Sequence, residues 1–357
     1  MAFLATAMVL AMSTWFAAAA VLSELRAEFD LSRTEGSWLT IAVQIGFVVG
    51  AVGSAVANLA DLIPPRRLVL IGSTVAAVAN LTLLVAPDLP SAMVGRAVTG
   101  AGLALVYPPG LKAASTWFRR RRGLALGVLV GALTLGSALP HLVAALGGIG
   151  WEETIVATSA LTLAGGLVAE FVARDGPFEF ATAVFDRRRI LTVFRQQELR
   201  LATLGYFGHM WELYAMWTWF GVFYTDLLRD RGTDDAAQWA SVATFFVVGA
   251  GAIGSWLGGV ISDRRGRELA AGSALALSGA VATVIGFLAD AHPLLVLALG
   301  LFWGFWVVAD SAQFSTIVSE RADEDSVGTA LTTQLASGFV LTVFTIFLVP
   351  VVEEAVG

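Results

Sequence analysis

The sequence predicts an all-α polytopic membrane protein built from two pseudo-symmetric, parallel helix bundles. The chain of 357 residues is 57% hydrophobic and only 14% charged, and its mean hydropathy is +0.77. Apolar stretches of about 20 residues, the length that crosses a hydrocarbon core as a helix, follow one another with short breaks. The segment Ala11–Phe16 (AMSTWF) returns 204 residues later as Ala215–Phe220 (AMWTWF), which indicates an internal duplication.

The composition also argues against several other classes of protein. Alternating strand patterns are missing, so a membrane β-barrel is not expected. The chain has no cysteine, which excludes disulfides and thiolate chemistry. His141, His209 and His292 have no metal-ligand spacing, so no metal site is predicted. The 37 glycines suit close helix packing in lipid.

Eleven membrane spans are expected along the chain. In order, they are 2–22, 37–60, 67–86, 91–113, 123–146, 154–173, 201–224, 238–260, 269–289, 293–317 and 327–350. No Lys or Arg precedes the first stretch, and the repeat matches it to an internal segment, so we expect a span rather than a signal peptide. The hydrophilic segment 174–200 then separates an N-terminal bundle of six helices (1–173, the first half) from a bundle of five (201–357, the second half).

The repeat extends beyond its first match. Asp61 matches Asp263 at an offset of 202 residues, and Gly123–Leu126 matches Gly328–Leu331 at an offset of 205. Six spans per repeat preserve the direction of the chain, so the two halves are expected to be parallel. A sixth span is then missing from the second half, which leaves a truncated chain and an eleven-span variant as alternatives.

Basic residues in the loops predict the orientation. Sixteen arginines fall on one side, the arginine-rich side, and four fall on the other, the acid-rich side. The sixteen are Arg66, Arg67, Arg119 to Arg122, Arg174, Arg187 to Arg189, Arg195, Arg200, Arg264, Arg265, Arg267 and Arg321. Because basic loops stay in the cytoplasm, we expect a plasma-membrane protein with a cytoplasmic N-terminus and a cytoplasmic linker 174–200.

Two motifs suggest a family. Gly259–Arg267 (GVISDRRGR) resembles the G-x-x-x-D-R-x-G-R signature of the major facilitator superfamily, and Ala57–Arg66 is a degenerate copy that keeps Asp61 but loses both glycines. Arg96–Gly102 (RAVTGAG) resembles the R-x-x-x-G-x-G element of the same superfamily. The resemblance covers the chain except for one helix. It implies secondary transport by alternating access, with a cavity lined by helices 1, 4, 7 and 10.

The signature residues are gating candidates. Asp61 and Asp263 lie at helix ends, where each can face the positive N-terminus of a neighbouring helix. Gly266 permits the turn between Asp263 and the next helix, and Arg264 and Arg267 belong to the same motif. The alternative is that these charges only set the topology.

A second gating candidate joins the two halves. Lys112 in span four and Asp310 in span ten both lie near the expected cytoplasmic ends of their helices. An ion pair between them could close the inward side, and the alternative is that both are solvated at helix ends.

Charge inside a span is the strongest indication of mechanism, because buried ionisable groups in membranes are usually functional or paired. Glu212 lies near the middle of span seven, and His209, three residues earlier, shares its face. We predict that this pair exchanges a coupling proton, H⁺ being the coupling ion and no other cofactor being expected. The alternative is a structural hydrogen-bonded pair.

Arg96 and a set of aromatic residues are the candidates for the cavity wall. Arg96 could bind an anionic group, pair with Glu212 or be purely structural. The other candidates are Trp15, Trp211, Tyr214, Trp303, Trp306 and Gln313. A wall of aromatic rings with a few polar groups suits a small organic solute.

Together these features predict a proton-coupled transporter of a small organic solute, not an enzyme. Its partners would be the solute and the lipid bilayer, with no nucleic acid, and the chain is expected to be monomeric. One alternative is a porter of a small inorganic anion, because Lys112–Phe118 (KAASTWF) is similar to nitrate- and cyanate-type porters. The arginines that nitrate porters carry in helices two and eight are missing here. Another alternative is a non-transporting receptor on the same scaffold.

Overall fold

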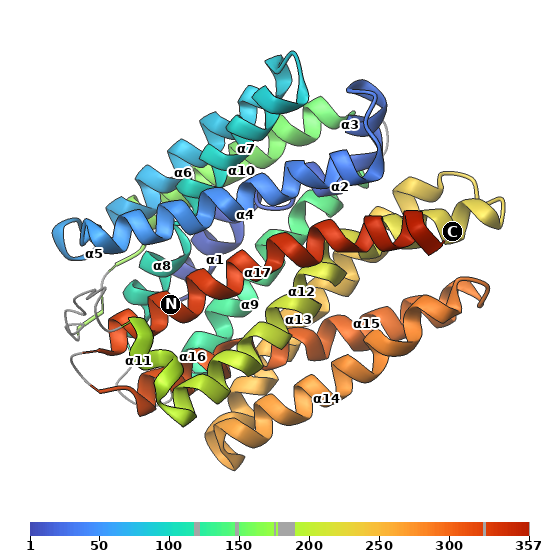
Figure 1. The fold of residues 1–357 in the computed structure, drawn as a ribbon. Coiled ribbons are helices and arrows are strands. Elements are labelled where there is room, and N and C mark those ends of the chain that lie inside the picture. Colours follow the sequence, from blue (N-terminus) through green and yellow to red (C-terminus); the bar gives the residue numbers. More distant parts are fainter. Residues whose placement is uncertain (118–121, 147–149, 175, 178–189, 324–325, 357) are drawn as a thin grey trace.

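The computed structural model describes residues 1–117, 122–146, 150–174, 176–177, 190–323 and 326–356, and this part of the chain is built from helices and short connections (Figure 1). The helices are α1 (Ala2–Ala11), α2 (Ala17–Ala20), α3 (Leu22–Glu28), α4 (Arg33–Val56), α5 (Leu59–Leu62), α6 (Pro65–Leu81), η1 (Thr82–Val85), α7 (Leu89–Leu103), α8 (Tyr107–Ser115), α9 (Arg122–Ala144), α10 (Trp151–Phe171), α11 (Ile190–Arg195), α12 (Gln197–Asp230), α13 (Ala236–Arg265), α14 (Arg267–Ile285), η3 (Gly286–Leu288), α15 (Pro293–Ala309), α16 (Ser311–Arg321) and α17 (Val327–Val356).

Nine helical segments in the described part are long and apolar enough to cross a membrane. They are Arg33–Val56, Pro65–Val85, Leu89–Ala114, Leu126–Ala144, Trp151–Phe171, Ala236–Arg265, Arg267–Leu288, Pro293–Arg321 and Val327–Ala355, and they correspond to nine of the eleven expected spans. The expected spans 2–22 and 201–224 are not among the nine. The second of these lies within α12, whose polar and aromatic residues lower its hydropathy.

The first expected span is interrupted. Helix α1 ends at Ala11, a turn covers Met12–Phe16, and α2 begins at Ala17. The prediction of one continuous helix over 2–22 is therefore wrong. The matching residues Ala215–Phe220 lie inside the uninterrupted helix α12. Nearly the same six residues thus form a turn in one half and a helix in the other.

Two further spans are interrupted at corresponding places of the repeat. A turn over Ala104–Val106 separates α7 from α8, and Asp310 separates α15 from α16. Asp310 lies 204 residues after Val106, which is the offset of the sequence repeat. Pro108 and Pro109 follow Tyr107 in the first turn of α8, where their missing N–H groups cannot continue the helix from α7.

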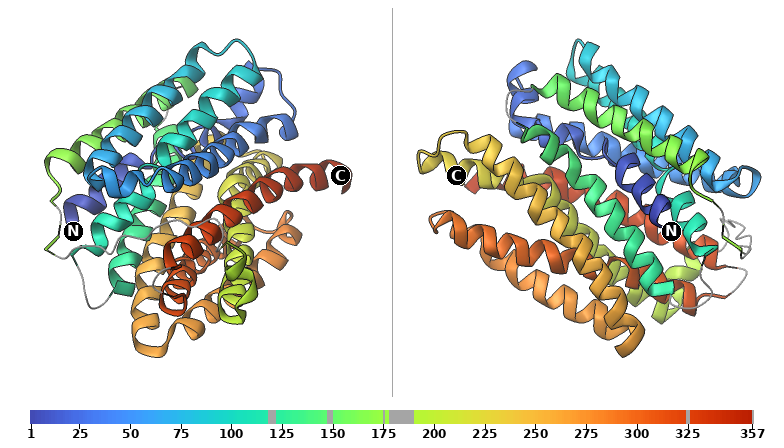
Figure 2. Two further views of the ribbon diagram at one scale, coloured as in Figure 1. Left: turned by 60° about the vertical axis from the view of Figure 1, so that its left-hand side comes forward. Right: turned by 180° about the vertical axis from the view of Figure 1, so that it is seen from behind.

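The two halves meet along two helix pairs. Helix α9 packs along α13, and α4 packs along α17, while the remaining extensive contacts join helices of one half (Figures 1 and 2). At the first seam the hydroxyl of Ser255 donates to the carbonyl oxygen of Gly127 over 2.8 Å. A Cβ on Gly127 would lie 2.8 Å from the Ser255 oxygen, and one on Gly131 would lie 3.0 Å from the Ala252 oxygen. Glycine therefore lets these two backbones touch, as the sequence spacing indicates.

Candidate functional site

A small cavity lies where the interrupted helices of both halves meet. Its volume is about 40 Å³, enough for roughly three water molecules. Trp15 reaches it from the turn after α1, Tyr107 from the start of α8, and Val308 and Ser311 from either side of the break at Asp310. Helices α9, α12 and α17 complete the wall. All three breaks thus border one site, as discontinuous helices do at the substrate sites of transporters.

An ionisable pair lies at this cavity. Nδ1 of His209, on α12, is 2.7 Å from Oδ1 of Asp310, and each side chain is only 1% exposed. Neither side chain makes a hydrogen bond to another group in the described part of the chain. The His209 ring also lies 5.9 Å from Tyr206 in a stacked arrangement and 6.1 Å from Phe314. The break between α15 and α16 therefore places the carboxyl group of Asp310 against the imidazole of His209 on α12.

Aromatic rings from both halves surround the cavity. The rings of Trp15 and Phe339 lie 5.7 Å apart, and those of Tyr214 and Phe339 lie 5.6 Å apart. Phe16 packs edge-on against Trp217 at 5.5 Å. The ring of Tyr214 also lies 5.9 Å from that of Phe16, so Trp15 and Tyr214, two of the residues predicted for the cavity wall, both contact the opposite half through their rings.

Glu212 is bound by groups other than His209. Its carboxylate accepts a hydrogen bond from Nε1 of Trp303 at 2.6 Å and another from the hydroxyl of Ser278 at 3.1 Å. Ser278 lies on α14 and Trp303 on α15, so Glu212 joins three helices of the second half. The expected His209–Glu212 contact is not formed. The partner of His209 is Asp310, which the sequence analysis treated as a gating residue.

Of the three roles considered for Arg96, its contacts in the structure fit the purely structural one. It is 1% exposed, and it donates to the carbonyl oxygens of Thr14, Trp15 and Leu39 and to the amide oxygen of Asn80. Two of these acceptors belong to the turn that interrupts the first span. The guanidinium therefore satisfies carbonyl groups that a continuous helix would have bonded itself. Its guanidinium does not bind Glu212, and Arg96 is not among the described residues that line the cavity.

Trp303, whose indole donates to Glu212, and three other candidates are not among the described residues that line the cavity. Trp211 is 41% exposed on the outer surface of α12. Trp306 packs its ring against Phe302 at 6.2 Å and Phe305 at 5.1 Å. Gln313 is fully buried in α16, and its amide has no hydrogen-bond partner in the described part of the chain.

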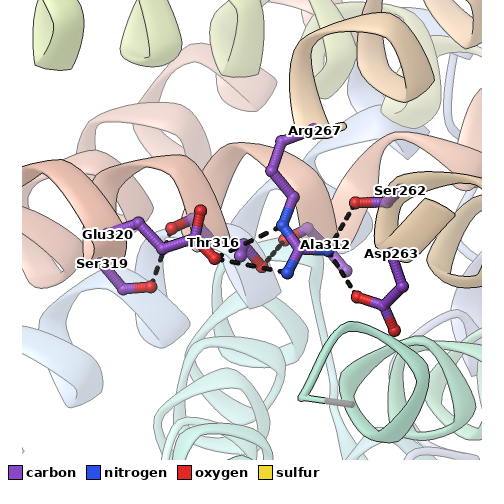
Figure 3. A network of polar contacts seen from close by, with 7 residues as sticks. All are labelled: Ser262, Asp263, Arg267, Ala312, Thr316, Ser319 and Glu320. Atoms are coloured by element: carbon purple, nitrogen blue, oxygen red, sulfur yellow. Dashed lines mark hydrogen bonds and ion pairs between the residues drawn. The ribbon is translucent and has the colours of Figure 1, made fainter. Parts of the chain in front are cut away.

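The signature motif forms a network on the arginine-rich side (Figure 3). Arg267 donates to Ser262 and Asp263, each at 2.7 Å, and lies 3.3 Å from a carboxylate oxygen of Glu320 on α16. Gly266 connects α13 to α14 with φ at +95°, a conformation that glycine adopts without strain. The carboxylate of Asp263 is thus bound to its own motif.

The remaining gating candidates have different environments. Arg264 is exposed at the end of α13. Asp61 belongs to α5, and its side chain lies outside the described part of the structure. Lys112 is on α8. Asp310, its expected partner across the halves, contacts His209 instead.

Comparison with known proteins identifies the family. A sequence model of the Major Facilitator Superfamily matches residues 3–348, nearly the whole chain. The chain belongs to this superfamily. The MFS transporter asaE of Aspergillus flavus is 26% identical over 246 residues, which cover 66% of this chain and 52% of that protein. The probable sulfoacetate transporter SauU of Cupriavidus necator is 26% identical over 225 residues, which cover 58% of this chain and 51% of that protein.

The chain matches about half the length of these curated relatives. Among solved structures, a D-xylose-proton symporter superimposes with a TM-score of 0.71 at 14% identity, over 98% of this chain and 88% of the other. At this identity the similarity concerns the fold. The superfamily resemblance drawn from the two motifs is thereby confirmed.

The acid-rich side of this superfamily member carries contacts that the sequence analysis missed. Arg33, at the start of α4, lies 2.7 Å from Asp226 on α12 and forms a second ion pair with Glu353 on α17. Thr34 donates to Glu354 at 3.1 Å. These contacts join the two halves. Arg33 is one of the four arginines counted on the acid-rich side, and no partner was predicted for it.

Proposed function

We propose that the protein is a secondary active transporter that moves a small organic solute by alternating access and couples this movement to protons. The observation that carries the proposal is the small cavity between the halves, which is bordered by three interrupted helices and lined by His209 of the buried pair His209–Asp310. A site formed by both halves is what alternating access requires, because each side must open in turn.

The ion pairs on the two sides support a state closed on the acid-rich side. There, Arg33 connects α4 with α12 and α17, across the halves. On the arginine-rich side, the pairs of Arg267 with Glu320 and of Arg321 with Glu198 each join helices of the second half. We expect transport to break the Arg33 contacts while these other pairs persist.

The pair His209–Asp310 is the proposed proton site, in place of His209 with Glu212. A neutral imidazole beside a carboxylate carries one negative charge, and uptake of one proton makes the pair neutral overall. A neutral pair is easier to keep in a low-dielectric site while the helices move. The other titratable groups near His209 are the phenols of Tyr206, Tyr107 and Tyr214, which also line the cavity, and Glu212, one turn away on α12.

The relatives are consistent with an organic solute. The C. necator relative carries the name of a sulfoacetate transporter, and sulfoacetate is a small organic acid. We further propose that the chain functions in the plasma membrane with its N-terminus in the cytoplasm, on the basis of the arginine-rich side.

Flux measurements on purified protein in liposomes test the proposal. An imposed pH gradient, acid outside, should drive accumulation of at least one small organic solute, and a protonophore should abolish it. Liposomes without protein are the control. Accumulation that persists without the gradient contradicts proton coupling, and the absence of flux for every solute favours the receptor alternative.

A further inference from the structure

We infer that the cavity binds a small organic monoanion, with a carboxylate or sulfonate group held by unpaired donors of both halves. This inference rests on the proposed transport function and names the substrate class of the same site. It follows from three properties of the cavity wall: its free hydrogen-bond donors, its single ionisable pair and its apolar, narrow interior.

The free donors are two indole groups, one from each half. Trp15 and Trp217 both line the cavity and are 1% and 2% exposed, and Nε1 of neither ring has a hydrogen-bond partner in the described part of the chain. An indole N–H only donates. A buried donor without an acceptor costs free energy, and a bound ligand that supplies acceptor oxygens removes this cost.

The hydroxyl groups around the cavity fit the same ligand. Tyr107, Tyr206 and Tyr214 line the wall, and each carries a phenol hydroxyl. A phenol hydroxyl donates readily to an anionic oxygen. No Asp or Glu is among the described residues that line the cavity, and Asp310 lies behind it against His209. A cationic solute would therefore meet hydrogen-bond donors and no carboxylate in the described wall.

The charge of the wall limits the ligand to one anionic group. Among the described residues that line the cavity, His209 is the one that can become a cation. Arg96 is nearby in the first half, but its guanidinium is bound to four acceptors and is not available. A second anionic group on the ligand would add another buried charge, and the described wall has no further cation to face it, which is strongly unfavourable.

The size and the apolar walls favour an organic ion over an inorganic one. The cavity has a volume of about 40 Å³, so the ligand is small and the wall must adjust to admit it. Val130, Leu133, Met210 and Phe339 supply apolar surface. A short hydrocarbon segment gains from contact with these side chains, and an inorganic oxyanion has none to offer.

Binding to the purified full-length chain, measured by calorimetry at uniform pH, tests the inference. Propionate and methanesulfonate should bind. Propionamide, which is isosteric with propionate, and propylammonium should bind at least roughly tenfold more weakly, because both lack an anionic acceptor group. Succinate and nitrate should also bind more weakly, because one adds a second charge and the other lacks the apolar segment.

Two variants assign the donors, and a third is the matched control. W217F and W15F keep a ring but remove the N–H, so each should weaken propionate binding roughly tenfold. W211F removes an indole N–H from the outer surface of the same helix as Trp217 and should leave binding unchanged. The unfolding temperature of each unliganded variant shows that it is folded.

Three results would overturn the inference. The first is that propionamide or propylammonium binds as tightly as propionate. The second is that succinate or nitrate binds as tightly as propionate. The third is that neither propionate nor methanesulfonate binds. Because this experiment uses no pH gradient, its failure leaves gradient-driven flux of another solute standing. Failure of the flux measurement, in turn, leaves the binding result standing.

Discussion

The guanidinium of Arg96 links three backbone carbonyl groups and one side-chain amide into one buried network. Beyond its own acceptors, its partner Asn80 donates to Ser159 over 3.0 Å, so the network reaches from the turn after α1 to α10. Because a single planar group satisfies acceptors on several helices, its loss leaves each of them buried without a donor.

We therefore predict that R96M lowers the free energy of unfolding by on the order of 3 kcal/mol. R96K should recover only part of this loss, because one ammonium group cannot reach acceptors on three sides. The thermal unfolding of the purified variants in detergent measures both effects. An unchanged unfolding temperature for R96M would show that the turn after α1 does not depend on this side chain.

At the scale of single residues, the sequence singled out ionisable side chains in apolar helices but did not indicate their partners. His209 and Asp310 were both singled out as charged groups in apolar helices, but in separate roles. Which of them meet depends on the rotation of α12 against α15 and on the break at Asp310. Neither can be derived from spacing along one helix.

At the scale of elements, the helix interruptions are the features that the sequence did not predict. The repeated AMxTWF segment forms a turn after α1 and a helix in α12. The difference lies outside the segment, because the turn has Arg96 to satisfy the carbonyls of Thr14 and Trp15. Tertiary contacts therefore override local preference at these residues. Nine other expected spans correspond to long apolar helical segments in the described part of the chain, although two of these segments contain an interruption.

Close helix packing gives a prediction at the same scale. A Cβ on Gly254 would lie 1.8 Å from the carbonyl oxygen of Phe305, so G254A should separate α13 from α15 and destabilise the protein by about 1–3 kcal/mol. Gly279 on α14 has no atom within 4 Å of its position for a Cβ, so G279A should be neutral or slightly stabilising. Thermal unfolding compares the two, and an equal effect of both changes would contradict the packing of α13 on α15.

At the scale of the whole molecule, the two halves are joined by ion pairs on the acid-rich side. The chain has no native cysteine, so introduced pairs can be cross-linked without background. We predict that a flexible bis-maleimide joining R33C to E353C abolishes flux, because α4 can no longer separate from α17. Liposome flux before and after cross-linking measures this effect.

A pair within one half is the control for that experiment. R321C and E198C lie on α16 and α12, both in the second half, and their cross-link should leave flux largely intact. Normal flux through the protein cross-linked between residues 33 and 353 would mean that the acid-rich side does not open during transport.

The most direct test of the central claim compares D310N with E212Q in liposomes, by gradient-driven accumulation and by solute exchange at equal pH. D310N should retain exchange but lose accumulation at least tenfold, because the pair with His209 no longer takes up and releases the proton. E212Q, which alters hydrogen bonds to Trp303 and Ser278 away from the cavity, should retain both activities. Accumulation by D310N at the level of the unmodified protein, or its loss in E212Q alone, would contradict the assignment of proton coupling to His209 and Asp310.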